Sequence, residues 1–213
     1  MVFSTFRKES FLPLVLFVSA LLVSSYIVSA QSEGTSALVS RWSGDDVSGE
    51  IASDTNDGND GTISGAVTVG PGKSGNALTF DGASGSITMG NPASLNFGTG
   101  PFSLEAWFMW DGGGSSVNNI IRKSNYGPGP GSGYWLRIGR DSKTLEFSIG
   151  ATTGPEGQTL ITAPISSGAW HHVVATRDRS DTVKLYVDGQ STGTFVRQAS
   201  AAESTSGSPF ALG

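Results

Sequence analysis

Two adjacent histidines, His171 and His172, are the only imidazoles in the chain and the first candidates for chemistry. They stand in a run of strand-forming residues at 170–176, and a second such run follows at 183–187. Successive side chains of a strand point to opposite faces, so the two imidazoles should diverge and cannot bind one metal ion together. The sequence therefore favours a structural role in a β-hairpin over metal binding or catalysis.

Carboxylates could hydrolyse glycosides, which in retaining enzymes requires two acids about 5 Å apart. Glu105 is the only acid in its expected strand, and Glu146 stands alone between Leu145 and Phe147. No expected strand carries two acids at alternate positions, so a catalytic pair could only be assembled in space. No serine lies in a glycine-flanked nucleophile elbow either, and we predict no catalytic residues.

The densest group of oxygen donors is the segment Asp54-Thr55-Asn56-Asp57-Gly58-Asn59-Asp60-Gly61. Calcium takes about six to eight oxygen ligands, and this segment offers carboxylates, amide oxygens and backbone carbonyls close together. It is not an EF-hand, because Gly58 stands where that loop needs a side-chain ligand and Gly65 stands where it needs a glutamate. A solvated acidic turn is the alternative to a calcium loop.

Five tryptophans suggest carbohydrate binding, since sugar faces stack on exposed aromatic rings. Trp42, Trp107 and Trp170 lie inside expected strands, and we expect them to pack in the core. Three aromatic residues at a strand end or beside the glycine- and proline-rich segment 127–133 form the predicted exposed ligand-binding surface: Trp110, Tyr126 and Trp135.

All of these residues depend on a succession of short strands separated by turns. Alternating and β-branched segments predict strands near residues 37–42, 62–69, 77–80, 86–89, 102–110, 118–122, 134–140, 144–149, 160–162, 170–177, 183–187 and 192–196. No segment has a sustained helical period. The pattern predicts an all-β fold, a two-sheet antiparallel jelly-roll sandwich.

The first 30 residues predict secretion. Arg7 and Lys8 precede an apolar run at 11–28, and Val28-Ser29-Ala30 supplies the small residues that a signal peptidase prefers. We expect cleavage after Ala30, which leaves no membrane segment and places the protein outside the cell or in its envelope. An uncleaved anchor is the alternative, because residues 11–30 approach the length that spans a bilayer. Residues 31–36 are then a polar linker and residues 37–213 the folded domain.

Composition excludes several classes of partner and site. The chain has 13 basic and 18 acidic residues, and removing Arg7, Lys8 and Glu9 leaves 11 and 17, a net charge of −6. No basic stripe remains for nucleic acid. Cysteine is absent, so neither a disulfide nor a thiolate metal site can form.

Five motifs, in order, resemble the laminin-G-like jelly-roll domains, relatives of the concanavalin-type lectins and glucanases. They are the segments 38–42, 54–62, 77–82 (Ala-Leu-Thr-Phe-Asp-Gly), 102–107 (Phe-Ser-Leu-Glu-Ala-Trp) and the hairpin 169–190. The resemblance spans about 38–213. The closing strand of such domains, with its Asp-Glu-Val run, has no counterpart, so we expect a domain that is incomplete at its C-terminus.

The resemblance implies a structural calcium held by Asp54 and the backbone near Asn59. Asp81 is either a further ligand or the cap of its own turn. It also implies a non-catalytic module that binds a carbohydrate or an extracellular protein through its loops or a concave sheet face. A glycan-degrading enzyme that uses Glu105 and Glu146, and a spacer domain of a larger surface protein, are the alternatives.

Overall fold

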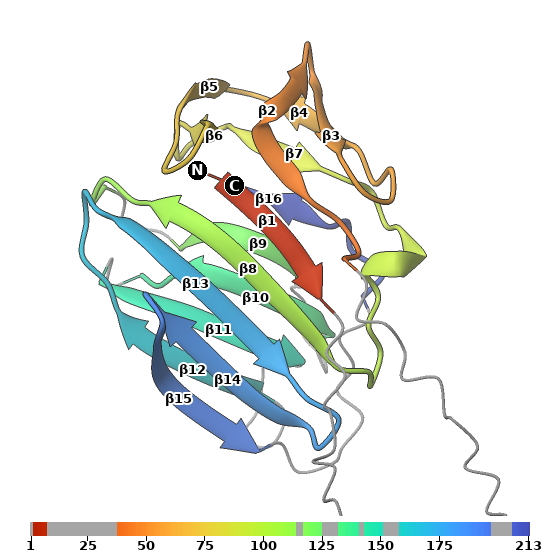
Figure 1. The fold of residues 1–213 in the computed structure, drawn as a ribbon, viewed down its shortest axis with the longest axis vertical. Helices are drawn as coiled ribbons and strands as arrows, with labels where there is room; N and C mark the ends of the chain where they lie inside the picture. Colours follow the sequence, from red (N-terminus) through yellow and green to blue (C-terminus); the bar gives the residue numbers. More distant parts are fainter. Residues whose placement is uncertain are drawn as a thin grey trace, which may run out of the picture.

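A computed structural model describes residues 2–7, 38–113, 117–124, 132–140, 143–150, 158–196 and 206–213. Antiparallel strands form almost all of its regular structure (Figure 1). The first eight strands are β1 (Val2–Arg7), β2 (Trp42–Ser48), β3 (Ile51–Asp54), β4 (Gly61–Ser64), β5 (Val67–Pro71), β6 (Asn76–Phe80), β7 (Ser86–Thr88) and β8 (Phe102–Met109). The others are β9 (Asn118–Ser124), β10 (Gly133–Ile138), β11 (Thr144–Gly150), β12 (Gln158–Pro164), β13 (Trp170–Arg177), β14 (Thr182–Val187), β15 (Gln190–Val196) and β16 (Ala211–Leu212).

These strands make two large sheets and one hairpin. One sheet has five strands in the order β1-β8-β13-β14-β15, and the other has nine in the order β12-β11-β10-β9-β16-β7-β4-β3-β2. Strands β5 and β6 pair only with each other among the described residues. The predicted all-β, two-sheet antiparallel sandwich is confirmed. No described segment is a helix of the length and hydrophobicity needed to cross a membrane.

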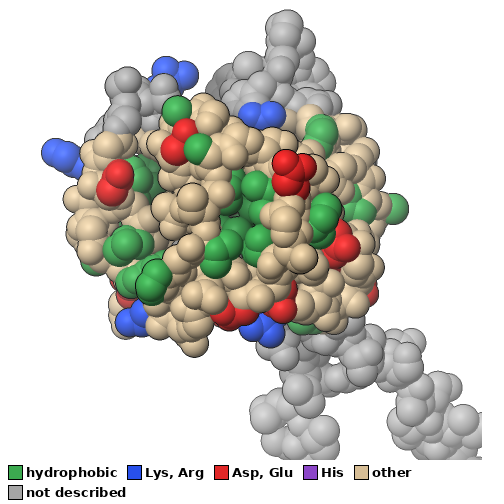
Figure 2. Space-filling view, turned by 90° about the horizontal axis from the view of Figure 1, so that it is seen from above, with side chains coloured by type: hydrophobic (Ala, Val, Ile, Leu, Met, Phe, Trp, Pro, Cys, Tyr) green, Lys and Arg blue, Asp and Glu red, His purple; other side chains and the backbone are tan. Residues whose placement is uncertain are grey.

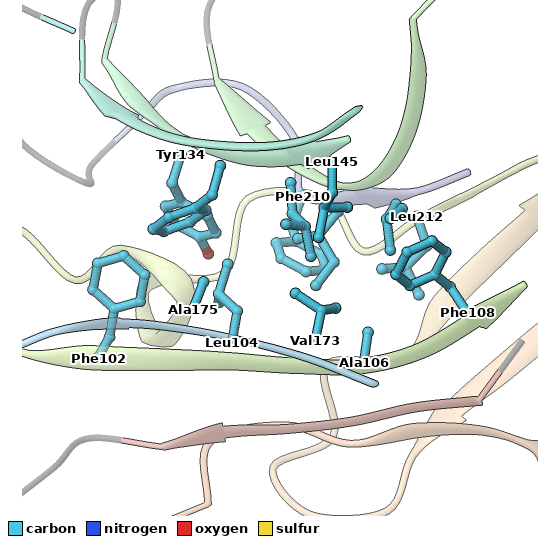
Figure 3. Packing of buried hydrophobic residues seen from close by; sticks show 14 of the residues in the cluster. Phe102, Leu104, Ala106, Phe108, Tyr134, Leu145, Val173, Ala175, Phe210 and Leu212 are labelled. Carbon is cyan, nitrogen blue, oxygen red and sulfur yellow. The ribbon is translucent and has the colours of Figure 1, made fainter. Parts of the chain in front are cut away.

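The core lies between the two large sheets and follows from the two-residue period of the strands. Every second residue of β8 is fully buried: Phe102, Leu104, Ala106 and Phe108. Figure 3 shows these side chains pointing from β8 toward residues of the nine-stranded sheet, among them Tyr134 and Leu145. Strands β8 and β13 pair without interruption, with Phe102 opposite Arg177 at one end and Met109 opposite Trp170 at the other. Strand β13 therefore adds Val173 and Ala175 to the same layer of the core.

The N-terminal part of the domain differs most from the sequence-based expectation. We expected one strand at 37–42, but β2 begins at Trp42 and pairs with β3, which was missed. The expected strand at 62–69 divides into β4 and β5 at Gly65, whose φ of 69° ends the extended run. The largely polar β2 and the short β3 show little alternation of polar and apolar residues, so their pairing rather than their sequence pattern defines them.

The hairpin β5–β6 and strands β2 to β4 form the upper end of the molecule in Figure 1. Seen from above, this end shows apolar side chains gathered at its centre, with acidic and basic groups around them (Figure 2). Among the apolar residues of these strands, Val69 and Ile51 are exposed, and Val67 and Phe80 are half-buried against the core. Strand β1, which lies inside the segment expected to be cleaved, runs beside β8.

A lysine lies in the interior beside this apolar core. Lys123 of β9 is fully buried, and its Nζ donates hydrogen bonds to Asn91 Oδ1 and, at 3.1 Å, to the Ser208 carbonyl. Its neighbour across the strand pair is Tyr134, whose hydroxyl donates to the Leu95 carbonyl at 3.0 Å. Burial lowers the pKa of Lys123 to about 8 and raises the pKa of Tyr134.

These two groups predict an unusual dependence of stability on alkaline pH. Between about pH 8 and 10 the unfolded chain holds the Lys123 proton and the folded chain does not, so the free energy of unfolding should rise with pH. Above about pH 10 the neutral Tyr134 of the folded state should reverse this trend. Urea unfolding at a series of pH values measures this dependence of the free energy of unfolding on pH. Lys123→Met should remove the rise, and Lys184→Met, on the outer face of β14, should keep it.

Candidate functional site

An open hollow of about 450 Å³ lies at one end of the sandwich, around Trp110. Its other lining residues come from three loops: Gly112, Lys143, Ile165, Ser166 and Ser167. Trp110 follows the last residue of β8, and its carbonyl accepts a hydrogen bond from Gly168 N at 2.7 Å. Its indole Nε1 donates to the Gly113 carbonyl at 3.2 Å. The hollow therefore combines a half-buried indole, two hydroxyl groups and an ammonium group.

The loop before β13 reaches the hollow because of the strand register. Met109 pairs with Trp170, so the end of β8 and the start of β13 are adjacent although they are far apart in sequence. A side chain at Gly112 would meet Ser167 at 3.2 Å, and Gly112 has a φ of 95°, a conformation that favours glycine. This glycine allows the two loops to approach each other closely.

Ser166, which lines the hollow, begins a serine, histidine and aspartate group in hydrogen-bonding order. Ser166 Oγ lies 3.1 Å from His171 Nε2, and His171 Nδ1 lies 2.8 Å from Asp188 Oδ2. The sequence did not predict this group, because His171 was expected to have a structural role in the hairpin, Asp188 was expected to form a turn, and Ser166 was not singled out. Its components are the three residue types of a nucleophilic hydrolase.

The hydrogen bonds of His171 form a clamp between two loops. Its Nε2 also lies 3.0 Å from the Ser166 carbonyl, and Asp188 contacts its Nδ1. The Asp188 carboxylate and the Ser166 carbonyl can only accept a hydrogen bond, whereas the Ser166 hydroxyl can donate or accept one. These contacts tie Ser166, His171 and Asp188 together. The clamp fastens the loop before β13 to the β14–β15 turn, where Asp188 Oδ1 also accepts from His172 N at 2.8 Å.

His172 lies on the opposite face of β13, as predicted. Its Nε2 is 2.9 Å from Glu105 Oε1, and its ring stacks on Trp107 with the ring centroids 4.9 Å apart. These residues lie on the outer face of the five-stranded sheet. Trp107 and Trp170 are half-buried outside the core, so their expected core packing is wrong, whereas Trp42 is 2% exposed and belongs to the core.

Glu105 and Glu146 do not form a catalytic pair. Glu146 alternates with the core residues Leu145 and Phe147, so it lies on the outer face of the nine-stranded sheet and pairs with Arg137 at 2.7 Å. Glu105 lies on the outer face of the other sheet, and the packed core separates the two carboxyl groups. The enzyme alternative built on these two residues is wrong.

Trp135 is 1% exposed, so it is not the exposed ring that we expected. It lies on the outer face of β10 beneath the guanidinium group of Arg137, which is 3.8 Å from the ring centroid. Its Nε1 and the Oγ of Ser148, its neighbour across the strand pair, are buried without a hydrogen-bond partner. Tyr126, the third predicted aromatic, lies outside the described residues. Of the predicted platform, only Trp110 is placed at a hollow.

The predicted calcium loop is held by its own hydrogen bonds. Asp54 Oδ1 accepts from Arg41 N at 2.8 Å and Asn56 N at 3.0 Å. Its Oδ2 accepts from Asp57 N at 3.4 Å and Asn59 N at 3.1 Å, so Asp54 and the backbone of Asn59 lie close together. The Asn59 carbonyl accepts from Trp42 Nε1 at 2.9 Å, which fastens the loop to the core.

Asp81 belongs to another turn, which it caps. Its Oδ1 accepts from the backbone amides of Ala83, Ser84 and Gly85 at 3.1, 2.9 and 2.8 Å. The amides of Ser84, Gly85 and Ala83, together with the Ser84 hydroxyl, hold the pKa of Asp81 well below its usual range. In the described parts of the chain, no three acidic or histidine side chains gather closely enough to hold a metal ion.

The 54–61 loop therefore offers oxygen donors of the kind that bind calcium, but its acidic side chains do not gather in a group of three that could hold an ion. Its oxygens are of the kind that calcium prefers. However, the Asp54 carboxylate already faces four N–H groups, and a bound ion would have to share it with them. Calcium at this loop stays a prediction.

The His171–Asp188 clamp predicts a loss of stability in acid. Burial raises the pKa of Asp188, but the hydrogen bonds from His172 N and His171 and the positive charge of these histidines outweigh it, and the net shift is downward. The pKa of Asp188 is therefore lower in the folded protein than in the unfolded chain, where it is about 3.9. Its carboxylate contributes its full stabilisation of the folded state above the unfolded-state pKa. That contribution is lost as the pH falls through the folded-state pKa.

Urea unfolding of the wild type and Asp188→Asn between about pH 6 and 2 measures this contribution. Asparagine tolerates the positive φ of 51° at this turn, so the hairpin should be kept. The variant should be less stable at pH 6, and the difference should shrink below about pH 4. The effect should be small because the side chain of Asp188 is 48% exposed. Glu50→Gln, in an exposed turn, is the control; a constant difference would contradict the ion pair.

Comparison with known proteins agrees with this architecture. Residues 80–213, more than half of the chain, match the family model of the concanavalin A-like lectin/glucanases superfamily. No curated protein matches the chain in sequence.

Several toxin binding domains have a similar fold. The binding domain of Paraclostridial Mosquitocidal Protein 1 is 14% identical with a TM-score of 0.60, over 78% of this chain and 42% of that one. A structure of botulinum neurotoxin type C, whose cell entry depends on two ganglioside molecules, is 16% identical with a TM-score of 0.55, over 76% and 39%. A botulinum neurotoxin DC binding domain in complex with rat synaptotagmin II is 15% identical with a TM-score of 0.52, over 76% and 40%.

The chain thus spans about two fifths of the length of these structures, and the likeness shows a shared fold. Together with the match over residues 80–213, the two-sheet antiparallel sandwich identifies the family. The chain belongs to the concanavalin A-like lectin and glucanase superfamily.

Proposed function

We propose that this chain is a non-catalytic, extracellular binding module that holds a carbohydrate in the Trp110 hollow. The observation that carries the proposal is the hollow itself, an open space of about 450 Å³ lined by Trp110, Ser166 and Ser167 among other residues. Ligand pockets typically measure about 300–1,000 Å³ and place a few polar groups among apolar ones.

A sugar matches the chemistry of these walls. Its apolar ring face can lie on the Trp110 indole, and its hydroxyl groups can exchange hydrogen bonds with serine hydroxyls. The Trp110 Nε1 is already bound to the Gly113 carbonyl, which fixes the orientation of the ring. The toxin domains of similar fold add support of a general kind, since one of them belongs to a toxin that depends on gangliosides. Secretion rests on the N-terminal sequence, with its basic start and apolar run.

A glycan-array screen followed by calorimetric titration with the tightest oligosaccharide tests the proposal. Trp110→Ala should weaken binding at least about tenfold, because it removes the ring on which the sugar rests. Met109→Ala is the matched control, since Met109 is the preceding residue, is 46% exposed and does not line the hollow. Binding that Trp110→Ala leaves unchanged would place the ligand elsewhere.

The same screen separates the alternatives. A saturable protein ligand without any glycan would favour an extracellular protein as the partner, for which the synaptotagmin complex of a similar domain is a precedent. No saturable ligand of either kind would favour a spacer domain.

A structural calcium at the 54–61 loop is a separate proposal, supported by the density of its oxygen donors. Calcium should raise the midpoint of thermal unfolding above its value in chelator, because a ligand of the folded state stabilises it by mass action. Asp54→Ala should abolish that difference. It should also lower the midpoint in chelator, since four backbone amides lose their acceptor. Equal midpoints with calcium and chelator would make the loop a turn only.

A further inference from the structure

The edge of the five-stranded sheet is covered by a strand that the expected maturation would remove. Strand β1 pairs antiparallel with β8, with Val2 opposite Trp107, Phe3 opposite Ala106, Phe6 opposite Leu104 and Arg7 opposite Ser103. Residues 2–7 lie inside the segment that carries the signal-peptide pattern. If cleavage follows Ala30, β1 is lost and β8 becomes the edge strand of its sheet.

Strand β8 has none of the features that normally protect a sheet edge. It contains neither proline nor lysine, and its pairing with β13 runs over eight residues without a bulge. Edge strands are commonly protected by lysine, proline, bulges or short length, and a long, regular, apolar edge tends to pair with another strand. Its one charged residue, Glu105, is already bound to His172.

Strand β1 occupies the place beside β8. β1 lies alongside β8 and also approaches β2 and β6, so these strands bound the place it occupies (Figure 1). An extended peptide can enter such a place, whereas the edge of another complete sheet would meet β2 and β6. This geometry favours a single inserted strand over a second copy of the domain.

We propose that β8 is a strand-acceptor site, which binds an extended peptide of about six residues antiparallel to it after the N-terminal segment is removed. The register and the faces of β8 define the peptide. Positions opposite Leu104 and Ala106 face the core and should be apolar. The position opposite Trp107 lies near Lys73, whose Nζ is 5.3 Å from the centroid of that indole, and an acidic residue there gains a positive partner.

The test uses the full chain with a specific protease site inserted between Ala30 and Gln31, kept in mild detergent because of the apolar run. Hydrogen exchange of the β8 amides is measured before and after the cut, once the released N-terminal peptide has been removed. Alternate amides of a strand point to opposite neighbours. The cut should therefore speed exchange at least about tenfold for those residues of 103–107 that face β1, and leave those that face β13 unchanged.

Synthetic peptides then probe the exposed edge. Val-Phe-Ser-Thr-Phe-Arg, the sequence of β1, should bind saturably and restore protection. The same peptide with proline in place of both phenylalanines should do neither, since proline has no N–H to donate. Glutamate in place of the valine should tighten binding about two- to fivefold through Lys73, and Lys73→Met should cancel that gain.

Three outcomes would overturn the proposal. Exchange that the cut leaves unchanged would show that β8 needs no partner strand. Equal binding of the proline-substituted peptide would show that backbone pairing is not involved. A doubled mass of the cut protein in light scattering, with protected β8 amides, would assign the edge to a second copy of the chain. None of these outcomes depends on whether the Trp110 hollow binds a sugar.

Discussion

The uninterrupted pairing of β8 with β13 is the constraint on which the rest of the structure depends. It fixes which residues of both strands face the core, and so it sends His171 and His172 to opposite sides of one sheet. The same register brings the end of β8 against the start of β13. Trp110 and the loop with Ser166 then meet at the hollow. A one-residue slip would exchange the two faces and separate these contacts from each other.

The fold was largely predictable because the alternation of apolar and polar residues that marks a strand is local and recurs along the chain. Strands with clear alternation, such as β8, β13 and β14, were expected nearly at their observed bounds, and the family resemblance pointed to the same two-sheet sandwich. Strands β2 and β3 were not, since their short and largely polar sequences show little alternation and are recognised as strands by their pairing. Strand β1 was read as part of a leader, and sequence alone does not show that it matches the edge of β8.

The candidate site was less predictable, because it depends on distances that the sequence does not contain. Trp110 was singled out as a residue beside a turn, whereas Ser166 and Ser167, which also line the hollow, come from a loop that the strand register brings near. Trp135 shows the opposite case. The alternation in β10 assigns it to the outer face, but that face can still be covered, here by Arg137, so facing outward is not the same as being exposed.

Hydrogen-bond saturation explains why the most suggestive residue groups are structural. Asp54 and Asp81 each accept several backbone N–H groups of their own loops, and Asp188 pairs with the backbone N–H of His172 and the imidazole of His171 on β13. A carboxylate that closes a turn in this way is occupied, which lowers its value as a ligand or a catalyst. The Trp110 hollow differs because its indole and hydroxyl groups line an open space. Its lining residues come from loops that paired strands hold in place, so the arrangement of the sheets fixes where the hollow lies.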